Sequence, residues 1–397
     1  MVDFSLTQKQ VEMQELAREF GEKHIKPVAM EIDKIPDPEK AFPVSLFEKG
    51  FEIGFQKACI PEKYGGLGLD CLTHVLVWEE LAAADIGYAI SLQAHNLAVA
   101  HMLNLGTEEQ RETFSKPIVE GGLAVISAVE ANAGAAVAVL DPLNFVWETT
   151  AVKNGDDWVL NGQKTYCSNA GTPLTRWICF LVRTNMEQTG ISAHSAFLVW
   201  PDTPGLTIGK NYDKMGHRMA YTPSIELKDV RVPNSQLVGE TAGFPLDPPA
   251  RTTTADNFLN VAAMAMGLAR TIYDECVAFA KTRVTNGKPM IQHQVVATKL
   301  ANMFIEMEAA RAMLWKAAWI SDTQPQTDQK MVVATKVMCS DMVARISREG
   351  LQIFGGHGYT KDTLIEKLYR DAKAPEIYEG ANDSLRVALG QFIEWGI

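Results

Sequence analysis

The chain has 397 residues, 47% of them hydrophobic and 21% charged, a composition ordinary for a globular protein of two or three domains. Its formal net charge of −11 argues against non-specific binding to nucleic acid or to an anionic membrane surface, because either partner needs a basic face. Six scattered cysteines form no CxxC pair. We therefore expect reduced thiols, and neither a disulfide framework nor a metal site.

The first seven residues lack the basic start and the apolar run of a signal peptide. No apolar run approaches the length of about 18 residues that a membrane span needs. These two features lead us to expect a cytoplasmic protein without membrane insertion.

Residues 1–124 are predicted to be helical. Thr7 is placed to cap a first helix, in which apolar residues recur near the 3.6-residue period. A loop rich in Pro and Gly follows at residues 60–70, and a helix-compatible, Ala-rich run extends from Asp70 to about Leu105. The glycines at 65, 66 and 68 have the wrong spacing for a dinucleotide loop, so we expect a structural turn there.

Residues 125–238 change to short β-branched and aromatic runs separated by turn residues, at 158–162, 177–182, 196–200 and 224–227. Residues 239–397 are again helical. One apolar face combines Val261, Ala265, Leu268, Ile272, Cys276 and Phe279, and residues 294–320 repeat the pattern. The predicted fold is therefore mainly α with a central β domain, an order that disfavours a doubly wound dinucleotide fold.

Eight short motifs occur along the chain in a fixed order. They are residues 61–66, 160–164, 229–233, Arg283, 287–289, 293–294, 352–359 and 370–380. In this order they resemble the acyl-CoA dehydrogenase family over nearly the whole chain. The resemblance implies a helical N-terminal domain, a β-barrel-like middle domain and a C-terminal four-helix bundle. It also implies non-covalent FAD, a homotetramer, an acyl-CoA thioester substrate and an electron-transfer flavoprotein as partner.

In this family the glutamate of the Tyr-Glu-Gly motif abstracts the α-proton of the thioester while a hydride passes to flavin N5. By resemblance that base is Glu379, with Tyr378 and Gly380 beside the acyl group, and its backbone N–H helps to hold the thioester carbonyl. An apolar pocket would raise the pKa of such a carboxylate toward the working range. The alternative is a solvated loop acid. The family's second base position corresponds here to Asn257, which cannot accept the proton.

Flavin contacts also follow from the resemblance. Four residues match positions that hold the FAD pyrophosphate and adenine, partly across a subunit interface: Arg283, Gln294, Gln352 and Gly356. Arginine suits a diphosphate because its N–H donors pair with phosphate oxygens. Arg283 could instead be a solvated helix end, and Gln352 a helix-surface residue. Tyr166 takes the place of the tryptophan that shields the ring, and Ser168 keeps the hydroxyl of the usual threonine.

Several positions depart from the family pattern. Val129 replaces a threonine whose hydroxyl bonds the flavin ring, Ala135 replaces a serine near CoA, and residues 136–146 could include an insertion. Asn286 and Ala381 replace a phenylalanine and a threonine, and Phe258 stands where an arginine is common. Lost donors near the ring should alter flavin electronics, although drift with compensation elsewhere would explain the same changes.

His95 falls where the family's helices line the acyl chain, so it could contact an unusual acyl group; a structural histidine is the alternative. Ala89 stands near the position where glutaryl-type members place an arginine, which disfavours a dicarboxylic substrate. Three hypotheses remain open from the sequence. They are an FAD-dependent dehydrogenase, a relative that performs elimination or C–S cleavage with structural flavin, and a non-catalytic subunit.

Overall fold

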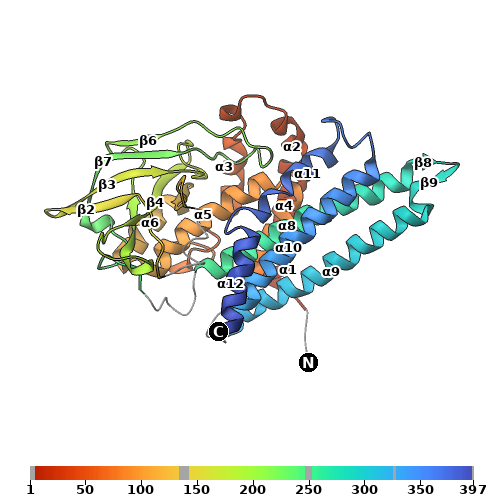
Figure 1. Ribbon diagram of the computed structural model, residues 1–397. Coiled ribbons are helices and arrows are strands. Elements are labelled where there is room, and N and C mark those ends of the chain that lie inside the picture. The colour runs from red at the N-terminus through yellow and green to blue at the C-terminus, as the bar shows by residue number, and fades with distance from the viewer. Residues whose placement is uncertain (1–4, 134–142, 246–252, 325–327, 396–397) are drawn as a thin grey trace.

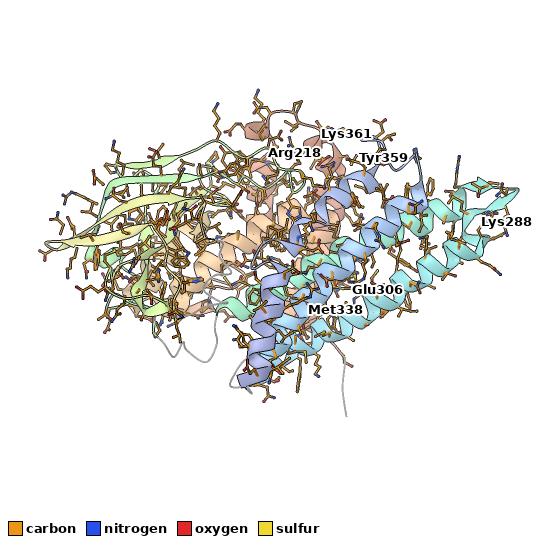
Figure 2. All side chains as sticks on the ribbon, in the orientation of Figure 1. Arg218, Lys288, Glu306, Met338, Tyr359 and Lys361 are labelled. Carbon is orange, nitrogen blue, oxygen red and sulfur yellow. The ribbon has the colours of Figure 1, made fainter. Side chains whose placement is uncertain are left out.

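The computed structural model describes residues 5–133, 143–245, 253–324 and 328–395. It has a β-rich end and a helical end, with the N-terminal helices between them (Figure 1). The small hairpin of β8 (Val284–Thr285) and β9 (Lys288–Pro289) marks the tip of the helical end, and Lys288 of this hairpin lies there far from the sheet (Figure 2). Among the described residues no helix is long and apolar enough to cross a membrane.

The N-terminal region contains six α-helices. They are α1 (Gln8–Phe20), α2 (Lys26–Asp33), α3 (Val44–Ile53), α4 (Cys71–Ala84), α5 (Ile86–Leu105) and α6 (Glu108–Val119), with a π-helical turn, Gly21–Ile25, between α1 and α2. The Thr7 cap is confirmed, because the Gln10 N–H donates to the Thr7 hydroxyl at 3.3 Å while the Gln10 side chain accepts from the Thr7 N–H at 2.9 Å.

The helical run expected from Asp70 to about Leu105 is divided in two at Asp85. This residue is extended (φ −163°), and its carboxylate accepts the N–H groups of Gly87 at 2.7 Å and Tyr88 at 3.2 Å. Asp85 therefore ends α4 and caps α5. Its other carboxylate oxygen accepts from Lys367 at 2.6 Å, a partner 282 residues away that local sequence patterns do not reveal.

The middle region is a mixed sheet. Its strands are β1 (Leu123–Ser127), β2 (Thr150–Asn154), β3 (Asp157–Lys164), β4 (Thr175–Arg183), β5 (His194–Val199), β6 (Leu206–Ile208) and β7 (Ile225–Pro233). The order is β1-β4-β2-β3-β7-β6, with β5 also paired to β4; β1 and β4 are parallel, whereas β3 and β7 are antiparallel. The four predicted runs fall in β3, β4, β5 and β7, which confirms them.

The C-terminal region contains the long helices α8 (Thr253–Thr282), α9 (Gln294–Thr323) and α10 (Gln329–Phe354), the hairpin β8 (Val284–Thr285) and β9 (Lys288–Pro289), and the shorter α11 (Leu364–Asp371) and α12 (Asn382–Trp395). Helix α8 packs against α4, α5, α9 and α10 (Figure 1). The predicted apolar face of α8 is buried from Val261 to Cys276, and Phe279 stacks on Phe354 at 4.1 Å. This shared core fixes α5 and α8 beside the loop before α12.

All six cysteines lie among the described residues as free thiols, and all except the half-buried Cys59 are buried. Burial raises the pKa of the Cys167 and Cys179 thiols to about 12. These sulfur atoms act as small apolar groups in the core.

Candidate active site

Glu379 lies in a short connection between α11 and α12. A 3₁₀ turn, Ala374–Glu376, leads into it, and α12 begins at Asn382. The backbone of Glu379 is left-handed (φ 52°), as is that of Gly380 (φ 93°). A glutamate in this region costs on the order of 1–3 kcal/mol relative to an unstrained residue. The surrounding structure must therefore hold the turn in place.

The Glu379 side chain is half-buried and reaches toward α5. Burial raises its pKa to about 7, although the charge of Lys336 and a hydrogen bond from Gln93 act in the opposite direction. A carboxylate with a pKa near 7 is partly ionised at neutral pH and can accept a proton from a weak carbon acid. This partly buried environment differs from that of a solvated loop acid, and the role of Glu379 as a base stays a prediction.

Gln93 joins Glu379 to α8. It is buried on α5, and its side-chain Nε2 donates to Oδ1 of Asn257 at 3.3 Å. Three separate elements, α5, α8 and the connection before α12, thus meet at Glu379. The Asn257 side chain, which occupies the family's alternative base position, is a neutral amide buried within this arrangement.

The fully buried acids of the described chain, unlike the half-buried Glu379, are all ion-paired. Glu79 pairs with Arg270 and Arg311, Glu80 with Arg18 and Arg270, Glu130 with Lys164, and Asp85 and Asp371 with Lys367, all at 2.5–3.2 Å. No ion pair within 4 Å is found for Glu379 among the residues with described placement. Its pKa of about 7 is therefore not lowered by a direct ion pair.

Asn257 also lines a polar cavity of about 410 Å³. It opens between α4, α5 and residues 59–64, and its lining includes His74, Asn96, Asn260 and Arg111. Burial lowers the pKa of His74 to about 4, so its imidazole is neutral. None of the described residues that line this cavity is acidic, so it supplies no second carboxylate base.

Lys336 of α10 contacts the turn at Gly380, the residue after Glu379. Its ammonium donates to the Gly380 carbonyl and to the Asn382 side chain, both at 2.8 Å, and the lysine is fully buried. Sequence reasoning missed this residue. A lysine between Val333 and Val337 on the apolar face of a helix was the signal that could have revealed it.

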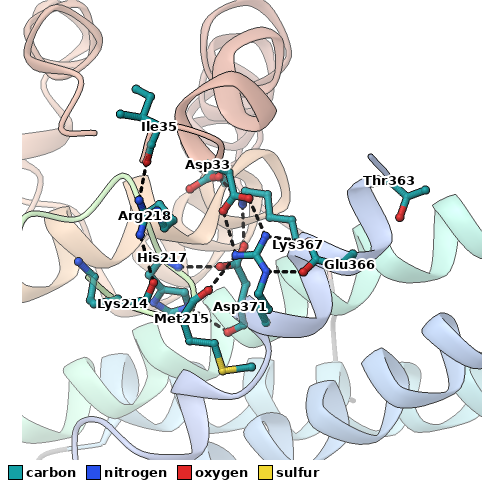
Figure 3. Close-up of polar contacts among 12 residues, drawn as sticks. Asp33, Ile35, Lys214, Met215, His217, Arg218, Thr363, Glu366, Lys367 and Asp371 are labelled. Carbon is teal, nitrogen blue, oxygen red and sulfur yellow. Dashed lines mark hydrogen bonds and ion pairs between the residues drawn. The ribbon is translucent and has the colours of Figure 1, made fainter. Parts of the chain in front are cut away.

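A buried ionic cluster lies near Tyr378, the residue before Glu379; Figure 3 shows its members Lys367, Asp371 and His217. Lys367 donates to Asp85 and to Asp371 at 2.6 Å each, and Asp371 accepts the backbone N–H of His217 at 2.6 Å. Although burial opposes it, the charges of the two aspartates raise the pKa of Lys367. The His217 ring lies 5.7 Å from that of Tyr378. The cluster thus ties α5, α11 and the loop after β6 to the residue preceding the base.

The residues predicted to contact the flavin ring gather in the sheet region. The Thr165 N–H donates to the Val129 carbonyl at 2.9 Å, and the hydroxyls of Ser168 and Thr222 lie 3.5 Å apart. Tyr166 is 62% exposed and left-handed (φ 57°), with its ring 5.2 Å from Tyr212. The exposed Tyr166 ring, carried on a left-handed backbone, is available to a planar ligand. Ala135 and residues 136–142 lie outside the described residues.

The residues predicted for the diphosphate and adenine lie at the other end of the chain. Arg283 follows α8, Gln294 begins α9, and Gln352 and Gly356 stand at the end of α10; all four are exposed. Tyr359, just beyond this segment, is likewise exposed near the bundle end (Figure 2). Figure 1 shows the hairpin β8–β9 at the opposite end of the molecule from β3. Arg283 and Gln294 flank this hairpin in the chain, whereas Tyr166 and Ser168 follow β3, so within one chain the two pairs lie apart.

His95 has both ring nitrogens occupied. Its Nε2 donates to the Gln56 carbonyl at 2.6 Å, and its Nδ1 accepts the Ala124 N–H at 2.7 Å. Burial lowers its pKa to about 4, so the ring is neutral. His95 thereby tethers α5 to β1, an arrangement that favours the structural alternative over contact with an acyl group. Phe258, beside Asn257 on α8, is buried in the main core.

The chain matches three family descriptions in succession: "Acyl-CoA dehydrogenase, N-terminal domain" over residues 7–122, "middle domain" over 127–230 and "C-terminal domain" over 250–393. It is 35% identical to a probable acyl-CoA dehydrogenase of Bacillus subtilis, covering 98% of this chain and 99% of that one. The short-chain specific enzyme of Megasphaera elsdenii is also 35% identical, over 98% and 99%.

Among solved structures, butyryl-CoA dehydrogenase from Megasphaera elsdenii matches with a TM-score of 0.90 and 34% identity over 99% of this chain and 100% of that one. A chain in a structure described as the electron transferring flavoprotein of Acidaminococcus fermentans matches with a TM-score of 0.89 and 32% identity, over 99% of each chain. The fold class predicted from the ordered motifs is confirmed by these matches.

Proposed function

Because the chain belongs to the acyl-CoA dehydrogenase family, FAD-dependent oxidoreductases that act on CH–CH groups, we propose that it oxidises an acyl-CoA thioester with Glu379 as the base. The observation that supports this assignment is the raised pKa of Glu379, about 7, in a described chain whose fully buried acids are all ion-paired. The relatives named as butyryl-CoA or short-chain specific dehydrogenases support a short acyl group.

The reaction at Glu379 is a proton transfer from carbon. The carboxylate takes the α-hydrogen as a proton, and the electron pair of that C–H bond remains on the substrate as an enolate. The backbone N–H of Glu379 is a suitable donor for the thioester oxygen, on which the charge develops. Bound FAD would supply the hydride acceptor for the β-hydrogen, so that loss of the α-proton and of the β-hydride together would leave the α,β double bond.

The residues of this chain fit FAD in two separated groups. The exposed Arg283 offers charge-assisted donors to a diphosphate, and a Cβ built on Gly356 would meet nothing within 4 Å, which leaves its backbone open to a phosphate. Tyr166 and Ser168 would flank the ring at the opposite end. Since the two groups lie apart in one chain, we infer that a complete cofactor site needs a second copy, as in a homotetramer.

The base assignment is tested by anaerobic flavin bleaching with a panel of acyl-CoA thioesters, beginning with butyryl-CoA. Wild-type protein should bleach, and Glu379→Gln should lose at least about a thousandfold in rate, because a primary amide cannot accept the proton. Bleaching of Glu379→Gln at the wild-type rate would contradict the assignment.

The shared cofactor site is tested by subunit mixing. Arg283→Ala and Glu379→Gln should each be inactive as homo-oligomers. Co-refolded subunits should regain activity, because some sites then combine Arg283 of one copy with Glu379 of another. Size-exclusion chromatography with light scattering measures the oligomer independently. A monomer that binds FAD at full affinity would refute the inference.

We infer an electron-transfer flavoprotein as the acceptor, supported by the similarity to the chain from Acidaminococcus fermentans. Reduction of such a flavoprotein under anaerobic turnover measures this directly. The competing reaction, elimination or C–S cleavage with structural flavin, is favoured by Val129, whose side chain offers no donor to the ring. That reaction would give product without any electron acceptor, so an acceptor-free assay separates the two.

A further inference from the structure

Lys336 occupies a position where an apolar side chain would be expected. The neighbouring positions on this face of α10, Val333, Val337, Ser340 and Val343, are all buried, and Lys336 itself is fully buried. An ammonium in such a place is costly unless hydrogen bonds replace its water. A specific set of partners must therefore account for its presence.

Those partners all belong to the junction between the Glu379 turn and α12. The Lys336 ammonium donates to the Gly380 carbonyl and to Oδ1 of Asn382, each at 2.8 Å. Asn382 in turn donates to Asp341 at 2.8 Å and to the Ser340 hydroxyl at 3.0 Å. One buried cation thus anchors the residue that follows the base and the first residue of the next helix.

Burial and the neighbouring charges act in opposite directions on the pKa of the Lys336 ammonium. Burial lowers the pKa of Lys336 to about 8, whereas Glu379, Asp341 and Glu376 raise it and Arg386 lowers it further. The lysine is consequently mostly protonated at pH 7. No direct ion pair with Glu379 is found among the described residues. The cation therefore acts on the carboxylate through space, without blocking the oxygen that must receive a proton.

We propose that Lys336 is a positioning residue for the dehydrogenation: its ammonium fixes the left-handed turn of Glu379 through the Gly380 carbonyl and favours the ionised carboxylate. The inference rests on the proposed role of Glu379 as the base. The geometric part follows from the two hydrogen bonds, because a strained turn persists only where its surroundings hold it. The electrostatic part follows from a positive charge in a poorly solvated site.

The test is the pH dependence of flavin bleaching by butyryl-CoA under single-turnover conditions, from pH 5.5 to 9, on FAD-loaded protein. In Lys336→Met the acid limb of the pH–rate profile should move to a pH about one unit higher. At pH values below the limb, its bleaching rate should be about tenfold lower than that of the wild type. Asn382→Leu keeps the ammonium but removes one anchor, so its rate should fall without a shift of the limb. Lys9→Met, at an exposed position of α1, is the matched control.

A Lys336→Met protein that binds FAD and keeps both the wild-type limb and rate overturns the proposal. If that variant does not fold, Lys336→Gln replaces it, because glutamine retains a donor for the Gly380 carbonyl but has no charge; an unshifted limb then overturns the electrostatic part. A wild-type rate in Asn382→Leu overturns the positioning part. Glu379→Gln, run in parallel, distinguishes these failures: only its bleaching at the wild-type rate would contradict the proposed function itself.

Discussion

Glu379→Gln should stabilise the protein at alkaline pH while it removes activity. The pKa of Glu379 is raised from 4.5 to about 7, a shift of about 2.5 pH units. At 1.36 kcal/mol per unit, the ionised carboxylate costs up to about 3 kcal/mol of unfolding free energy. Because solvent reaches part of the side chain, we expect about 2 kcal/mol in practice. Glutamine has no ionised form and avoids this cost.

The sign follows from proton linkage. Between pH 4.5 and 7 the folded state binds the Glu379 proton more tightly than the unfolded state does, so stability falls as the pH rises through this window. The advantage of Glu379→Gln should therefore be absent near pH 4.5 and complete above pH 7. For a chain of 397 residues, about 2 kcal/mol corresponds to an increase in Tm of about 2–3 °C.

Scanning calorimetry of wild-type and Glu379→Gln holoenzymes at pH 5 and pH 8, at one scan rate, measures this effect. Glu376→Gln is the matched control: Glu376 is three residues earlier in the same connection and is paired with Lys373 at 2.8 Å. An equal difference between Glu379→Gln and wild type at both pH values would refute the reasoning, as would a less stable Glu379→Gln at pH 8.

Three further outcomes are expected. The rate of flavin bleaching by the wild-type protein should show an acid limb near pH 7, where Glu379 titrates; a flat profile between pH 5.5 and 8 would contradict this. Lys164→Met should lose about 3–5 kcal/mol in urea unfolding by leaving Glu130 buried without its partner, and adding Glu130→Gln should recover part of this loss. Gly66→Ala should lower Tm by about 1–4 °C, since its Cβ would collide with the Ile60 carbonyl; an unchanged Tm would be inconsistent with that packing.

The predictable parts of this molecule depend on local patterns. Hydrophobic periodicity identified the buried face of α8, β-branched runs identified β3, β4, β5 and β7, and Thr7 identified the first helix cap. The division of the helical run at Asp85 was not predictable, because an extended residue was needed there and its carboxylate meets Lys367 only in the folded chain.

Within the site, the sequence pointed to Glu379 through a motif, but not to the residues that set its chemistry. Gln93 and Lys336 come from helices 286 and 43 positions earlier in the chain, and only packing brings them to the turn. The same limit applies to His95, whose two backbone partners emerge only when α5 meets β1. Local patterns thus pointed to Glu379, whereas its pKa depends on tertiary contacts.

The distance between Arg283 and Tyr166 along the molecule has a consequence for how the protein should behave on dilution. If two copies complete each cofactor site, then flavin occupancy and subunit association are linked equilibria, and each favours the other. When the protein is diluted and passed through an ultrafiltration membrane, free flavin should appear in the filtrate. Added FAD should keep the subunits associated. Stored at low concentration, such a protein would lose its activity without any part of its fold being damaged.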